Sequence, residues 1–321
     1  RNQMRYWIAD PVRVVNFLPV NHIGCVGDLS SWTLVAGGCI VFMEKYDPAG
    51  ALQLGIREHC TVWGGVPTTI LMTLSLPDFA SYDLSDLQLI VWSGAAAPEE
   101  VIRRLCTITP NLSNSYGMTE TVGSLTFAGP CDDVDELANS VGYPVPEYEF
   151  RIVGPDNRPV AQGEPGEICT RGDFIMRGYW RRPKETAETI DAEGWLHTGD
   201  LAVERPDGTI RLVGRLKEMF KSGGYNVYPR EIEQVLEACP GVGMAAVVSV
   251  PDPVYDEIGH AFILREPGAN LTPAALEAAC RAKLANYKVP KRFVIADELP
   301  LLPIGKLDKR LLKERARTQP A

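Results

Sequence analysis

The segment Tyr116-Gly117-Met118-Thr119-Glu120 is the first of four polar motifs that follow one another along the 321-residue chain. The other three are Gly194-Trp195-Leu196-His197-Thr198-Gly199-Asp200, Gly214-Arg215-Leu216-Lys217-Glu218 and Pro303-Ile304-Gly305-Lys306. Each motif alone is typical of a loop with a few polar side chains. The fold is predicted by these motifs together with the apolar runs and small-residue turns around them.

Apolar runs upstream of the first motif indicate parallel strands that alternate with helices. Residues 14–18, 39–42 and 87–92 are predicted to be buried strands, with a helix between the first two. The third run ends at Ser93-Gly94-Ala95-Ala96-Ala97, after which a helix is expected with Pro98 in its first turn. This alternation predicts an α/β domain, and such domains bind ligands at the carboxyl ends of their strands.

The sequence pattern changes twice after this domain. Short strands are expected at residues 150–153 and 167–170, with a hairpin turn at 206–209, which together predict a small β subdomain. After Arg215, helices from residues 229 and 273 and a strand at 245–250 predict a compact α+β segment, with Thr272 as a helix N-cap. We therefore divide the chain into residues 1–140, 141–215 and 216–321.

The composition is that of a soluble globular protein, with 45% apolar and 23% charged residues. A net charge of −9 disfavours sequence-independent nucleic-acid binding, which needs a basic surface. The sequence has no apolar run of about 18 residues that would span a bilayer. The eight cysteines form no CxxC pair and predict reduced thiols in a cytoplasmic protein, rather than a disulfide or zinc framework.

The four motifs, taken in order, resemble those of the adenylate-forming enzymes: acyl-CoA synthetases, firefly luciferase and the adenylation domains of peptide synthetases. The resemblance runs from about Asn16 to Lys309. It implies the C-terminal part of a large α/β domain with a small β subdomain, followed by a mobile α+β C-terminal domain. It also implies ATP, Mg²⁺ and CoA as cofactors and a small-molecule carboxylic acid as the substrate.

The resemblance assigns roles to individual residues. Thr119, His22 and Lys306 are expected to be catalytic, with the lysine bridging carboxylate and phosphate, and Glu120 is expected to bind Mg²⁺. Lys217 matches the hinge between the large and small domains. Ser222, Gly223 and Gly224 match the CoA site. The expected nucleotide site comprises Gly94, Ala95, Ala96, Asn114, Tyr116, Gly117, Thr119, Asp200, Arg215 and Lys306.

The acyl pocket is expected to include His22, Trp92 and Gly117. A plain core position explains Trp92 equally well. Amino-acid adenylation domains place an Asp near Asn21, where this chain has Asn21-His22, which favours a non-amino carboxylic acid. An acyl-CoA synthetase is therefore the first hypothesis, and an adenylation domain that loads a carrier protein is the alternative. A non-catalytic relative is disfavoured by the presence of Lys306, Glu120 and Asp200.

The family's Ser/Thr/Gly-rich phosphate loop ending in Lys-Gly does not occur in this sequence. We therefore expect the chain to be the C-terminal part of a longer enzyme and to be inactive in adenylation by itself. The identity of the acid stays open at this point. So does the oligomeric state, with a homo-oligomer as one option.

Overall fold

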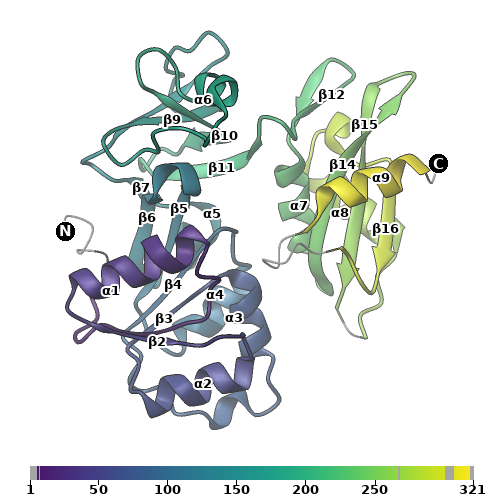
Figure 1. Cartoon of the computed structure of the whole chain (residues 1–321). Coiled ribbons are helices and arrows are strands. Elements are labelled where there is room, and N and C mark those ends of the chain that lie inside the picture. The colour runs from purple at the N-terminus through teal and green to yellow at the C-terminus, as the bar shows by residue number, and fades with distance from the viewer. Residues whose placement is uncertain (1–5, 7, 267, 301–306, 319–321) are drawn as a thin grey trace. The chain divides into compact units, whose positions relative to one another are not determined.

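The computed structural model describes residues 6, 8–266, 268–300 and 307–318. The chain forms two compact units (Figure 1). One contains residues 1–198 and 202–212, and the other contains residues 199–201 and 213–321.

The first unit is built on a seven-stranded sheet with the order β2-β1-β3-β4-β5-β6-β7. Its strands are β1 (Arg13–Asn16), β2 (Cys39–Phe42), β3 (Val62–Gly65), β4 (Leu89–Ser93), β5 (Leu112–Met118), β6 (Gly123–Cys131) and β7 (Tyr143–Pro144). Strands β1 to β5 are parallel to one another, and β6 and β7 continue the sheet antiparallel. The predicted apolar runs therefore become parallel strands, of which β1 and β4 are largely buried. The edge strand β2 is only partly buried, so its predicted burial was wrong.

Helices cover both faces of this sheet. Its helical segments are η2 (Gly24–Ser31), α1 (Trp32–Val35), α2 (Pro48–Arg57), α3 (Pro67–Leu74), η3 (Phe79–Ser81), α4 (Glu99–Cys106), η4 (Thr119–Thr121) and α5 (Val134–Asn139). Side chains of α3 and α4, such as Ile70 and Ile102, form one buried cluster with Ile90 of β4. On the other face, Leu29 of η2 packs with Leu89 and Val14. The predicted α/β class is confirmed.

Two local expectations were only partly right. The helix expected between the first two strands is present, but its first eight residues form the π-helix η2. Pro98 occupies the N-cap of α4 rather than its first turn, because its extended ψ of 145° precedes the helix. Glu99 and Glu100 then lie in the first turn, where the helix dipole favours acidic side chains.

A second, four-stranded sheet has the order β11-β10-β9-β8. Its elements are β8 (Glu149–Val153), β9 (Gly166–Arg171), α6 (Pro183–Thr189), β10 (Leu196–Glu204) and β11 (Ile210–Arg215). The predicted turn joins β10 to β11. There the Asp207 carboxylate accepts a 2.9 Å hydrogen bond from the Thr209 N–H, and Gly208 takes the left-handed φ of +83°.

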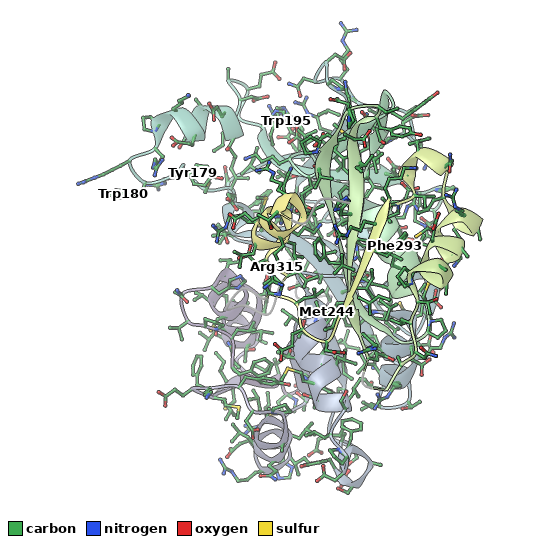
Figure 2. The ribbon with its side chains drawn as sticks, turned by 90° about the vertical axis from the view of Figure 1, so that its right-hand side faces the viewer. Tyr179, Trp180, Trp195, Met244, Phe293 and Arg315 are labelled. Carbon is green, nitrogen blue, oxygen red and sulfur yellow. The ribbon has the colours of Figure 1, made fainter. Side chains whose placement is uncertain are left out.

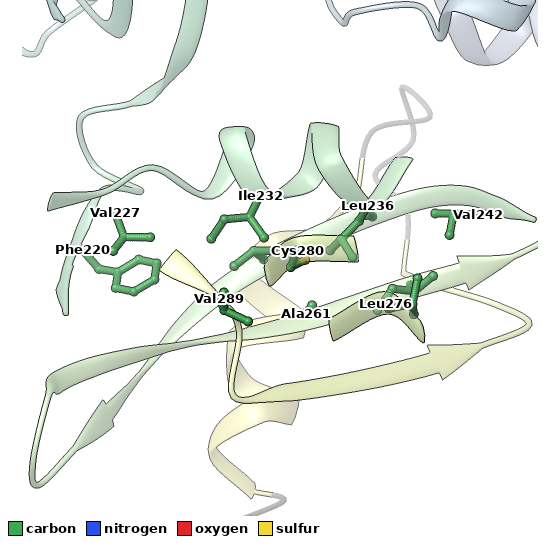
Figure 3. Close-up of a cluster of buried hydrophobic side chains, with 12 residues drawn as sticks. Phe220, Val227, Ile232, Leu236, Val242, Ala261, Leu276, Cys280 and Val289 are labelled. Atoms are coloured by element: carbon green, nitrogen blue, oxygen red, sulfur yellow. The ribbon is translucent and has the colours of Figure 1, made fainter. Parts of the chain in front are cut away.

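The second unit is an α+β fold around a five-stranded sheet. Its elements are β12 (Phe220–Ser222), β13 (Tyr225–Val227), α7 (Pro229–Glu237), β14 (Val242–Asp252), β15 (Asp256–Arg265), α8 (Pro273–Lys283), η5 (Asn286–Lys288), β16 (Arg292–Ala296) and α9 (Lys309–Thr318). Helices α7 and α8 pack on one sheet face through Ile232, Leu236 and Leu276 (Figure 3). Leu312 of α9 belongs to a second cluster. The predicted cap is present, since Thr272 Oγ1 accepts a hydrogen bond from the Ala275 N–H.

No helix among the described residues is long and apolar enough to cross a membrane. All eight cysteines lie in the described part of the chain and are free thiols. Burial raises the pKa of the Cys60 and Cys280 thiols to about 11, so these side chains are neutral at physiological pH.

Candidate active site

The first candidate site lies at the carboxyl ends of the parallel strands of the first unit. Strand β4 ends at Ser93 and is followed by Gly94, whose φ is +83°, and by exposed Ala95 and Ala96. Strand β5 ends at Met118 and leads directly into the turn that carries Thr119 and Glu120. Because β4 and β5 are parallel neighbours, these two loops emerge from the same edge of the sheet.

Gly117 is required by the fold itself. A Cβ atom at this position would lie 2.1 Å from the carbonyl oxygen of Gly123 on the neighbouring strand β6. The opposing backbone therefore excludes a side chain at Gly117. Tyr116, expected in the nucleotide site, has only 7% of its surface exposed and packs in a cluster with Leu125 and Ile152.

Thr119 and Glu120 are presented by the short helix η4, which a side-chain hydrogen bond closes. The Thr121 hydroxyl accepts a 3.0 Å hydrogen bond from the Met118 N–H and lies 2.7 Å from the Gly123 carbonyl oxygen. Val122 follows with a φ of +53°, a left-handed conformation that β-branched residues rarely adopt. This local strain, of about 1–3 kcal/mol for such residues, is typical of functional turns.

Glu120 is held in place from the second sheet. The Tyr179 phenol donates a 2.8 Å hydrogen bond to Glu120 Oε1, and the Met176 N–H donates to the Glu120 carbonyl oxygen at 2.8 Å. Burial, followed by this bond to Glu120, raises the pKa of Tyr179, which therefore remains a donor. Figure 2 shows Tyr179 and Trp180 together in the loop that precedes α6. One carboxylate oxygen of Glu120 is thus positioned, and carboxylate oxygens are suitable ligands for Mg²⁺.

His22 lies in the turn between β1 and η2, with its side chain exposed. The Gly24 N–H donates a 3.0 Å hydrogen bond to His22 Nδ1, so the proton of the neutral imidazole is on Nε2. Fully buried Asn16 anchors the same turn, since its Nδ2 donates to the Cys25 carbonyl and to Ser30 Oγ. The hydrogen bonds of Asn16 therefore hold this turn in place. Because Nδ1 of His22 already accepts a hydrogen bond, Nε2 is the ring atom available to a ligand.

A concave pocket opens beside this edge of the sheet, with about 480 Å³ of space that includes its open mouth. The lining residues include Gly24, Gly65, Trp92 and Ser93, at or near the ends of strands β1, β3 and β4. His22 contacts the lining through Gly24 but, like Gly117, is not itself part of it.

Two predicted residues lie mainly on the opposite face of the sheet. The Trp92 ring is 2% exposed and packs with Ile90 and Ile102. Strand alternation therefore directs Ser93, rather than the indole, toward the cavity. Asn114 Nδ2 donates to the carbonyl oxygens of Leu137 and Ser140, at 2.7 and 3.0 Å. This places the Asn114 side chain against the segment around α5.

The second unit contains the other predicted residues. Arg215 Nε donates a 3.1 Å hydrogen bond to Asp200 Oδ1, so these two predicted nucleotide ligands form an ion pair. Lys217, the predicted hinge residue, is exposed. Ser222 is buried, whereas Gly223 and Gly224 are exposed and have φ angles of +57° and +85°. Lys306 lies outside the described residues.

Glu167, Cys169 and His197 form a cluster with metal-ligand chemistry on β9 and β10. His197 Nδ1 lies 2.8 Å from Glu167 Oε2 and 3.4 Å from Cys169 Sγ. The pKa of the Cys169 thiol is raised to about 12, and burial is the largest cause. The contacts of His197 with Glu167 and Cys169 form a hydrogen-bonded support for the motif that contains His197.

Comparison with known proteins identifies the family. Residues 2–180 match the AMP-binding enzyme family, and residues 231–306 match the AMP-binding enzyme C-terminal domain. The chain belongs to the AMP-binding enzyme family. The resemblance inferred from the four motifs is therefore confirmed.

Similar AMP-binding enzymes include a putative acyl-CoA synthetase, YngI, of Bacillus subtilis (strain 168), 36% identical over 93% of this chain and 55% of that protein. A feruloyl-CoA synthase of Amycolatopsis sp is 36% identical over 96% of this chain and 62% of its own length. The structure of ATP-bound MatB from Rhodopseudomonas palustris has a TM-score of 0.87 at 30% identity, covering 98% of this chain and 62% of that one. The chain thus spans 55 to 62% of these relatives.

Sequence reasoning missed several residues of this AMP-binding enzyme. Asp28, Ser115 and Ser124 line the cavity, and Tyr179 binds Glu120. Asp28 had a detectable signal, since it is the single acid in the otherwise uncharged run from Val14 to Phe42. The serines had none, because hydroxyl residues on a strand carry no indication of which face holds a cavity.

Proposed function

We propose that the protein carrying this chain is an AMP-forming acid–thiol ligase that acts on a non-amino carboxylic acid. In the first step, a carboxylate oxygen attacks the α-phosphorus of ATP, which gives acyl-AMP and releases pyrophosphate. In the second, the sulfur of CoA attacks the acyl carbonyl carbon, which gives the thioester and releases AMP. Both steps need an enzyme that holds the reactants in line and stabilises phosphate charge.

The observation that carries this proposal is the convergence of three features at one edge of the seven-stranded sheet. The small-residue loop after β4 allows a flat base to lie against its backbone. The turn after β5 offers the exposed Thr119 hydroxyl as a donor to phosphate and the fixed Glu120 carboxylate as a magnesium ligand. The pocket beside them opens at the same edge of the sheet, where an acyl group would enter.

Other roles in the proposal rest on the family resemblance. Asp200, paired with Arg215, would accept hydrogen bonds from the ribose hydroxyls, and the guanidinium orients this carboxylate. Lys306 would bridge the carboxylate and the α-phosphate during adenylation. Lys217 would be the hinge for domain rotation, and Ser222, Gly223 and Gly224 would approach the pantetheine of CoA.

CoA is favoured as the acceptor by the relatives, two of which are named as CoA synthetases or synthases. A carrier protein as acceptor is the alternative from the sequence. Acid-dependent exchange of pyrophosphate into ATP by the complete protein tests the first step. Mass spectrometry of the products with CoA tests the second. Exchange without a CoA thioester from any acid would contradict the second step alone.

The two steps can also be separated by mutation. Lys306→Ala should block adenylation yet leave the conversion of supplied acyl-AMP to the thioester largely intact. Lys184→Ala, which removes an exposed lysine of α6, is the matched control and should change neither step. Equal losses in both steps of the Lys306 variant would exclude a role confined to adenylation.

A further inference from the structure

The cavity beside the strand ends is lined by side chains of two chemical kinds. The apolar ones include Leu29, Trp32 and the pair Tyr6 and Phe127, whose rings stack 4.3 Å apart. The polar lining residues come from η2 and from strands β4, β5 and β6 and include Asp28, Ser93, Ser113, Ser115 and Ser124. A pocket for a plain hydrocarbon chain has no need of these polar side chains.

Among the lining residues that the structure describes, Asp28 is the only charged one. Ser124 Oγ lies 3.3 Å from Asp28 Oδ1 and 2.9 Å from Ser115 Oγ, so a chain of hydroxyls ends at the carboxylate. Among the described residues, the polar contacts that act on its pKa come from Ser124 alone, and no basic side chain contributes. A carboxylate has about four acceptor positions, so capacity remains for a donor from a ligand.

The surroundings of Asp28 oppose its charge. Burial raises the pKa of its carboxyl from the ordinary 3.8 to about 6, although hydrogen bonds from Ser124 lower it in part. In the described part of the chain, no salt bridge or helix cap involves Asp28. No such structural contact therefore offsets the cost of its charge. A half-buried, incompletely compensated carboxylate at a ligand cavity is the pattern of a recognition residue.

We propose that Asp28 is a specificity-determining residue that selects hydroxylated carboxylic acids, by accepting a hydrogen bond from a hydroxyl group on the acyl part. This inference rests on the proposed function, because it takes the cavity to be the acyl site. A hydroxyl group needs only one acceptor, and the rest of the acid can then contact the apolar side chains of the cavity. An ammonium group has three donors to satisfy and would add a second buried charge beside aromatic rings.

The test compares acids that differ only in this group. Benzoic and hexanoic acids are each used as the parent and in methyl-, hydroxyl- and amino-substituted forms, with the substituent moved along the molecule. Methyl and hydroxyl groups are nearly equal in size, so their ratio isolates the hydrogen bond. In the complete protein, kcat/KM for exchange should be higher by about tenfold or more for the best hydroxyl isomer than for its methyl analogue.

Asp28→Ala should reduce this hydroxyl-to-methyl ratio to about one, mainly by loss on the hydroxylated acid. Asp28→Asn, which keeps the volume and a neutral acceptor, should give an intermediate ratio and guards against misfolding of the alanine variant. Asp78→Ala removes an exposed aspartate outside the cavity and should leave the ratio unchanged. A methyl or amino preference in the wild type, or an unchanged ratio in Asp28→Ala, would overturn the proposal.

Titration calorimetry with the same acids distinguishes the specificity role of Asp28 from the proposed reaction. A hydroxyl preference in binding that depends on Asp28, without any exchange, would support the specificity role and contradict the proposed reaction. If exchange occurs and its hydroxyl-to-methyl ratio is the same in Asp28→Ala as in the wild type, the reaction is supported and the specificity role is contradicted.

Discussion

The phenol of Tyr179 donates a hydrogen bond to Glu120 Oε1 at 2.8 Å, across 59 positions of sequence. This contact links the loop before α6 to the turn after β5. It gives the proposed magnesium ligand a fixed orientation that its own short helix does not provide. The first prediction follows from this link.

Tyr179→Phe should reduce adenylation by the complete protein about three- to tenfold, the usual effect of losing one hydrogen bond. Glu120→Ala should cost more, about 2–4 kcal/mol of transition-state stabilisation, because a charge is lost. Exchange rates measured over a range of Mg²⁺ concentrations should show a weaker apparent metal affinity in both variants. Tyr143→Phe, at an exposed tyrosine, is the control. Unchanged metal dependence in Glu120→Ala would remove this residue from the site.

Gly117→Ala should destabilise the first unit by more than about 3 kcal/mol, because the new Cβ has no room beside the backbone of β6. Gly55→Ala makes the same change inside α2, where a Cβ meets only atoms at 3.8 Å or beyond. That variant should be neutral or more stable by about 0.5–1 kcal/mol. Denaturant unfolding measures both. A stable Gly117→Ala protein would show that β6 can shift away.

The stability of the first unit should depend on the charge of Asp28. Its folded pKa of about 6 lies above the ordinary 3.8, so the folded state holds this proton more tightly than the unfolded state. The contribution of the Asp28 carboxyl group to the free energy of unfolding is therefore largest below pH 4. It falls as the pH rises toward 6 and stays at its lowest value above pH 6. The full difference is about 3 kcal/mol, from 1.36 kcal/mol per pKa unit.

Asp28→Asn should remove this pH dependence and be the more stable protein at pH 7 to 8. The measurement is denaturant unfolding of wild type and variant at several pH values without ligand, with Asp78→Asn as control. A variant that is less stable than wild type at pH 8 would indicate that the carboxylate has a structural role.

Two ion pairs of the second unit should differ strongly in their contribution. Glu233 is 3% exposed, accepts from the Val247 N–H, and pairs with Lys309 Nζ at 2.9 Å. Glu233→Ala leaves the buried Val247 N–H without its acceptor, while Lys309 keeps Glu218 as a partner, and should cost about 1–3 kcal/mol of unfolding free energy. Glu277→Ala breaks an exposed pair with Arg281 on α8 and should cost about 0.5 kcal/mol or less. Similar losses would mean that the burial of Glu233 does not decide its effect.

The fold class followed from short-range patterns, whereas parts of the site did not. Residues 87–92 were predicted as a buried strand, and residues 89–93 form one, because a strand covered on both faces needs a continuous apolar run. The contact of Tyr179 with Glu120 depends on how a loop returns to a distant turn, and no local pattern encodes that. The constraint on Gly117 was not predictable locally either, since the backbone that excludes a Cβ belongs to β6, a strand formed by residues further along the chain.

The raised pKa of Asp28 has a consequence for engineering this protein. Changes of specificity usually sacrifice stability, because new pocket shapes disturb packing. Here the wild-type residue is itself the destabilising one at neutral pH. Replacing it with a neutral side chain should broaden the range of acids toward those without a hydroxyl and strengthen the fold in a single step. A variant with a neutral residue at position 28 is therefore a suitable parent for a library of altered ligases, because its added stability would tolerate further destabilising substitutions.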